Sequence, residues 1–134
     1  MTPRLKTEIW VGAYMRRIAA AGVMGVVARR GDPDAGAVAV KVYARGEARV
    51  FVQSRDAAGA AGFRDALTGF QPEAEADGYL QKTAAIDPDL WIVEIEREDG
   101  DPMLTEPVFE ENPPGEANRE AERFFSGPGR GGRR

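Results

Sequence analysis

Residues 38–53 read VAVKVYARGEARVFVQ, and this stretch decides the fold class. Apolar residues alternate with other residues on both sides of Arg45-Gly46-Glu47, which is the pattern of two half-buried strands joined by a tight turn. A three-residue loop at this turn would place Val42 opposite Val50. We therefore expect an antiparallel hairpin within a sheet.

Two helices and further strands are expected around the hairpin. Residues 2–21 have apolar side chains at helical spacing, with Pro3 suited to the first turn and Gly22 at the usual C-terminal position. A second helix is expected to begin at Pro72 and to end before Asp87-Pro88. The other expected strands are 23–30 and 90–96, and a short strand at 63–68 is left open.

The resulting order, α-β-β-β-(β)-α-β, predicts a single α+β domain. We expect a mainly antiparallel sheet of four to five strands, with the N-terminal helix and the middle helix gathered on one face. The compact domain is expected to span residues 1–99. Residues 100–134 are rich in proline and acidic side chains, so we expect a mobile tail with at most a short helix at 116–125 that carries Phe124 and Phe125.

The composition excludes much catalytic chemistry. A chain of 134 residues is one ordinary domain, and it contains neither cysteine nor histidine. Thiol nucleophiles, thiolate metal sites and Ser–His or Cys–His pairs are therefore excluded, and we expect no resident cofactor. No signal-peptide pattern opens the chain, and the longest apolar stretch, residues 18–28, is too short to cross a bilayer. The expected location is the cytoplasm, without membrane contact.

The charge is distributed unevenly along the chain. The net charge of −4 comes from +5 in residues 1–56, −12 in residues 57–126 and +3 in residues 127–134. This asymmetry, without a catalytic motif, favours a non-enzymatic binding or adaptor module with a protein partner. The expected contact residues lie on the first helix and at the end of the last strand: Arg16, Arg17, Glu94 and Glu96.

A first alternative is a Mg²⁺-dependent enzyme that acts on phosphate esters. The motifs Asp32-Pro33-Asp34 and Asp87-Pro88-Asp89 each place two carboxylates in a loop next to a strand. Carboxylate oxygens are the ligands that Mg²⁺ prefers, and Lys41 or Arg30 would lie near the phosphate. Aspartate side chains also bind the backbone of their own turns, so both motifs have a structural interpretation as well. The four candidate ligands are Asp32, Asp34, Asp87 and Asp89.

A second alternative is single-stranded nucleic-acid binding by one face of the hairpin. Under the expected register, basic and aromatic side chains would be interleaved on that face, where bases could stack on them. If a helix covers the face, the same aromatic residues belong to the core, and an isoelectric point near 5.0 also argues against nucleic acid. The residues concerned are Lys41, Tyr43, Arg49 and Phe51.

Three blocks of sequence resemble a family of small bacterial proteins. They are RLKTEIWV at residues 4–11, RGDPDAG at 30–36 and DPDLWIVEIE at 87–96, in this order. The family is known as a domain of unknown function of the DUF1491 type. The resemblance covers about residues 4–97 and implies one compact domain over that span, but it implies no activity, cofactor or catalytic residue.

Overall fold

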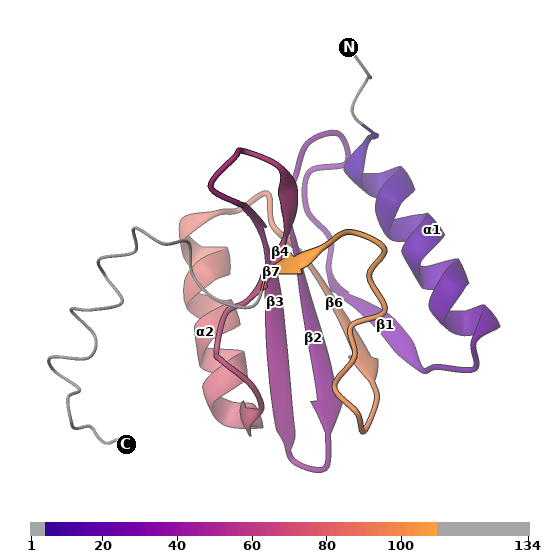
Figure 1. Cartoon of the computed structure of the whole chain (residues 1–134), viewed down its shortest axis with the longest axis vertical. Coiled ribbons are helices and arrows are strands. Elements are labelled where there is room, and N and C mark those ends of the chain that lie inside the picture. Colours follow the sequence, from indigo (N-terminus) through magenta and orange to yellow (C-terminus); the bar gives the residue numbers. More distant parts are fainter. Residues whose placement is uncertain (1–4, 110–134) are drawn as a thin grey trace, which may run out of the picture.

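The computed structural model describes residues 5–109, where two helices lie on opposite sides of one seven-stranded sheet (Figure 1). The helices are α1 (Thr7–Ala20) and α2 (Glu73–Ile86). The strands are β1 (Gly25–Arg29), β2 (Val38–Ala44), β3 (Glu47–Arg55), β4 (Ala61–Asp65), β5 (Gln71–Pro72), β6 (Trp91–Glu96) and β7 (Val108–Phe109). Their order across the sheet is β1-β6-β2-β3-β4-β7, and β5 pairs with β3.

The sheet is mixed. β2, β3 and β4 form an antiparallel meander, and β1 is antiparallel to β6. β6 runs parallel to β2, with Val40 opposite Val93, because α2 first carries the chain back along the sheet. β7 is likewise parallel to β4. The prediction of an α+β domain with two helices is confirmed, whereas the prediction of four to five mainly antiparallel strands is only roughly right.

The two helices cover opposite faces of the sheet, so the prediction that they gather on one face is wrong. α1 buries Val11, Tyr14 and Ile18 against one face, and α2 buries Ala76 and Leu80 against the other. The physical reason lies in β2, whose first five residues are all buried. A strand that is buried on both sides requires a cover on both sides.

The turn of the hairpin has two residues instead of three. Arg45 and Gly46 have φ angles of 52° and 84°, the positive values that a tight type I′ turn requires. Val42 therefore lies opposite Arg49 and not opposite Val50. The expected register is wrong by one residue, and a slip of one residue moves every side chain of a strand to the other face.

The packed structure continues past the expected domain limit at residue 99. Residues 100–109 return along α1, where Pro102 is buried and its carbonyl oxygen accepts a 2.8 Å hydrogen bond from the hydroxyl of Tyr14. β7 then adds to the edge of the sheet beside β4. The helix expected at 116–125 lies outside the described residues.

Candidate functional site

A pocket of about 440 Å³ opens between the start of α1 and the ends of β3 and β4 that lie beside it. This volume lies within the range of ordinary ligand sites, about 300–1,000 Å³. Trp10 and Phe63 form an aromatic wall, and Arg55 and Glu106 bring opposite charges to the lining. Polar atoms also come from Thr7, Gln53 and Ser54.

The indole ring of Trp10 is held in place by three neighbours. It stacks nearly parallel on Tyr14, with ring centroids 5.3 Å apart, and packs beside Phe63 at 5.9 Å. Its Nε1–H group donates a 2.7 Å hydrogen bond to a carboxylate oxygen of Glu106. A ring that is already fixed loses little conformational entropy when a ligand packs against it, so this wall is preorganised for binding.

The polar rim of the pocket is fixed by the end of β3. Gln53 accepts a 2.8 Å hydrogen bond from the backbone N–H of Val38, which ties its side chain to β2. Arg55 donates a 2.7 Å hydrogen bond to the carbonyl oxygen of Gly59 in the loop that leads to β4. These contacts position an exposed cation on one part of the rim, while Glu106 is anchored by Trp10 on another.

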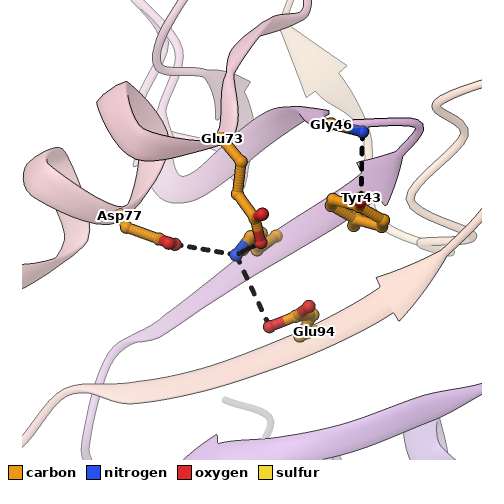
Figure 2. A network of polar contacts seen from close by, with 6 residues as sticks. Tyr43, Gly46, Glu73, Asp77 and Glu94 are labelled. Carbon is orange, nitrogen blue, oxygen red and sulfur yellow. Dashed lines mark hydrogen bonds and ion pairs between the residues drawn. The ribbon is translucent and has the colours of Figure 1, made fainter.

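A second polar centre lies on the other face of the sheet, where three carboxylates converge on the ammonium group of Lys41 (Figure 2). The Nζ atom lies 2.7 Å from an oxygen of Glu73 and of Asp77, both on α2, and 3.6 Å from an oxygen of Glu94 on β6. Burial alone would lower the pKa of Lys41, but the hydrogen bonds and charges of these carboxylates outweigh it and raise the pKa. Lys41 therefore stays protonated at neutral pH, and it ties α2 to the sheet.

The four residues expected to form a nucleic-acid platform do not share a face. Lys41 and Tyr43 face the α2 side, whereas Arg49 and Phe51 face the α1 side, because the hairpin register is shifted by one residue. Phe51 is only 1% exposed, and Arg49 donates a 2.9 Å hydrogen bond to Asp65. The shared basic and aromatic surface on which this hypothesis depended is therefore absent from the hairpin.

The two Asp-Pro-Asp motifs are neighbours at one end of the sheet. The backbone N–H of Asp32 donates a 3.0 Å hydrogen bond to the carbonyl oxygen of Asp89. The carboxylates of Asp32 and Asp87, however, accept hydrogen bonds from the backbone of their own turns. Asp32 accepts a 2.8 Å bond from the N–H of Ala35, and Asp87 accepts a 3.1 Å bond from the N–H of Asp89. The carboxylate of Asp34 lies 3.8 Å from the ammonium group of Lys6. Within residues 5–109, no three His, Cys, Asp or Glu side chains are grouped so that they could hold a metal ion.

The four residues expected to meet a protein partner lie on two separate surfaces. Arg16 is exposed on α1, and Arg17 on the same helix donates a 2.9 Å hydrogen bond to the carbonyl oxygen of Met103. Glu94 and Glu96 lie on β6 and face the opposite side of the sheet. The structure does not bring the two pairs together, and their role in partner binding stays a prediction.

The pocket has no counterpart among the sites expected from the sequence. Trp10 widens the apolar stripe of the first helix, and such a stripe points to the core rather than to a site. Glu106 lies in the segment expected to form a tail. The bond between them joins residues 96 positions apart, and no local pattern in the sequence indicates such a contact.

The fold and the sequence together define the family. The chain belongs to the DUF1491 family of proteins of unknown function, whose profile matches residues 5–105. This confirms the resemblance seen in the sequence and extends its expected span by several residues. A comparison with curated proteins gave no significant match. Among the residues that the structure describes, no helix is long and apolar enough to span a membrane.

Three solved structures, two of them of DUF1491 family proteins, are similar to this chain in fold. The crystal structure of a DUF1491 family protein from Caulobacter crescentus CB15 is 42% identical, with a TM-score of 0.73 over 79% of this chain and 100% of that one. An NMR structure of a family protein from the same organism is 41% identical, with a TM-score of 0.71 over 81% and 99%. The solution structure of protein Atu0922 from A. tumefaciens is 28% identical, with a TM-score of 0.67 over 84% and 100%.

Proposed function

We propose that this protein is a non-enzymatic binding module, and that the pocket beside Trp10 takes a short segment of a partner protein. The observation that carries this proposal is the preformed aromatic wall in a pocket whose lining also includes the opposite charges of Arg55 and Glu106. A large apolar side chain of the segment would fill the volume against Trp10. Charged groups beside that side chain would meet Arg55 and Glu106.

The chemistry of the lining supports binding rather than catalysis. The hydroxyl group of Thr7 donates a 2.7 Å hydrogen bond to the carbonyl oxygen of Gly36, and the carboxylate of Glu106 is engaged by Trp10. Both groups therefore maintain the shape of the pocket. Lys41 is protonated and faces the other side of the sheet. The chain has no cysteine or histidine that could act as nucleophile or base.

A selection of random displayed peptides on the full chain tests the proposal. Ala61→Phe adds a ring to the lining of the pocket, whereas Ala58→Phe adds the same ring to the exposed loop between β3 and β4 and is the control. We expect selected peptides to bind the wild-type chain and the Ala58→Phe variant alike. They should bind Ala61→Phe at least about ten-fold more weakly, since that ring occupies their site.

Two results would overturn the proposal. One is a selection that enriches no peptide above the level of a denatured-protein control. The other is a set of peptides that bind Ala61→Phe as well as they bind the wild type. If the peptides of this second result are basic and lose affinity on Glu96→Lys, they bind instead to the acidic surface formed by β6 and α2, where three carboxylates surround the ammonium group of Lys41.

A further inference from the structure

The outer edge of β1 is unpaired among residues 5–109, and the side chains of β1 that precede Arg29 are apolar. β1 is the terminal strand of the sheet, and Met24, Val26 and Val27 are 70%, 57% and 36% exposed. Exposed edge strands usually carry a charged residue or a proline that blocks the approach of another strand. Residues 24–28, MGVVA, contain neither, and the one charged residue of β1 is Arg29 at its end. This edge is therefore a template for a further strand.

The pairing of β1 with β6 shows which backbone groups point outward. The N–H of Glu96 donates a 3.1 Å hydrogen bond to the carbonyl oxygen of Met24, so these two residues form a hydrogen-bonded pair. Hydrogen-bonded and non-hydrogen-bonded pairs alternate along an antiparallel ladder, and the register is regular from Gly25 to Val27. Val26 therefore bonds to β6, while the N–H and C=O groups of Gly25 and Val27 point away from it.

We propose that β1 pairs antiparallel with β1 of a second copy of this chain, about a two-fold axis that passes beside Val26. In this register, Gly25 of one copy and Val27 of the other exchange both hydrogen bonds, so the outward groups of both residues are satisfied in both copies. Val26 then faces its symmetry mate directly across the axis. Such a contact is closed, so it gives a dimer and not a filament.

The charges at the two ends of β1 favour a second copy over an unrelated strand. Arg29 and Arg30 lie at the C-terminal end of β1, whereas Glu96 lies beside Met24 at the start. Antiparallel pairing brings the basic end of each copy toward the acidic end of the other. A parallel arrangement of the same strands would bring like charges together.

The interface is short. A β-bulge interrupts the pairing of β1 between Val27 and Arg29, and a bulge bends an edge strand away from a regular ladder. The contact is therefore centred on residues 24–28. Helix α2 packs on β2, β3 and β5, so it does not cover Val26 on β1. We expect a weak dimer, with a dissociation constant roughly micromolar or higher.

Sedimentation velocity of the full chain over a range of concentrations tests the dimer. Val26→Lys places two ammonium groups against each other across the axis, and within one copy the new lysine lies opposite Glu94, which helps the variant to fold. We expect this change to weaken dimerisation at least ten-fold. Ile86→Lys is the control, because Ile86 is 84% exposed at the end of α2, away from the edge.

Mixing two variants makes the test specific for the register. Val26→Lys and Val26→Glu should each dimerise at least ten-fold more weakly than the wild type, while their equimolar mixture should form a heterodimer, because position 26 meets only itself across the axis. The proposal is overturned if the wild-type chain remains monomeric at millimolar concentration. It is equally overturned if Val26→Lys dimerises like the wild type, or if the mixture stays monomeric while the wild type dimerises.

Discussion

Tyr14 and Pro102 lie 88 positions apart in the chain, and a buried hydrogen bond of 2.8 Å joins the hydroxyl group of the first to the carbonyl oxygen of the second. Together with the bond between Trp10 and Glu106, it fastens residues 100–109 to α1. The pocket depends on this attachment, because Glu106 supplies one of its two charges.

Tyr14→Phe is expected to lower the free energy of unfolding by about 1–2 kcal/mol, because the carbonyl group of Pro102 stays buried without its partner while the aromatic ring is kept. Urea denaturation measures the loss. Tyr79→Phe also removes a tyrosine hydroxyl group, but from α2 and away from residues 100–109. It should therefore lower the free energy of unfolding by less. Equal effects of the two substitutions would show that the bond to Pro102 adds nothing to stability.

Ending the chain after Asp99 is expected to destabilise it relative to a chain that ends after Phe109. Met103 and Leu104 pack partly buried against the core under α1, and β7 pairs with β4. Burial of two such side chains contributes about 2–4 kcal/mol. Thermal denaturation of the two chains compares them directly. Equal melting temperatures would mean that residues 100–109 add nothing to stability.

The sequence predicts the elements well because their patterns are local. The hairpin, both helices and the strand at 90–96 follow from alternation, helical spacing and proline or glycine boundaries. The side of the sheet to which each side chain points was not predictable to the same degree. A turn of two residues rather than three depends on the left-handed conformation of Arg45, a residue that rarely adopts it, and this single turn decides where Arg49 and Phe51 point.

The candidate site was even less predictable, because its parts meet only in the folded chain. Trp10 comes from α1, Arg55 from the end of β3 and Glu106 from the segment before β7. Each residue has an ordinary local explanation in the sequence. The surroundings of Lys41 were equally hard to predict. The alternating pattern places Lys41 on a half-buried strand, but its three carboxylate neighbours come from α2 and β6.

Stability is expected to fall in alkaline solution. Burial raises the pKa of Tyr14, and the carboxylates around Lys41 raise the pKa of that lysine despite its burial. In the unfolded chain both groups lose their protons near their ordinary pKa values of about 10. Their contribution is therefore complete below pH 10 and is lost as the pH rises through the higher pKa values of the folded state.

The free energy of unfolding, measured by urea denaturation from pH 7 to 11, tests this expectation. The wild-type chain should lose stability above about pH 10, and Tyr14→Phe should lose it less steeply because one of the two titrating groups is gone. A wild-type curve that stays flat to pH 11 would contradict the raised pKa values of both groups.

Lys41→Met is expected to lower the free energy of unfolding at pH 7 by about 1–3 kcal/mol, because Glu73, Asp77 and Glu94 then repel one another without a cation between them. Their partial exposure keeps the cost below that of a fully buried pair. Lys82→Met, which replaces an exposed lysine on α2, is the control. A deficit no larger than that of Lys82→Met would mean that the ion pairs of Lys41 add nothing to stability.

Replacing a glycine with alanine is expected to have opposite effects on stability at Gly46 and at Gly78. Gly46 has a φ angle of 84° in the turn that sets the hairpin register, and no atom lies within 4 Å of the position that a Cβ would take there. Gly46→Ala is therefore expected to cost about 1 kcal/mol through backbone strain alone. Gly78 lies inside α2 with equally open space, and Gly78→Ala should stabilise the chain by about 0.5–1 kcal/mol. Urea midpoints measure both changes, and a Gly46→Ala variant as stable as the wild type would mean that the turn, and with it the register of β3, is not the one described.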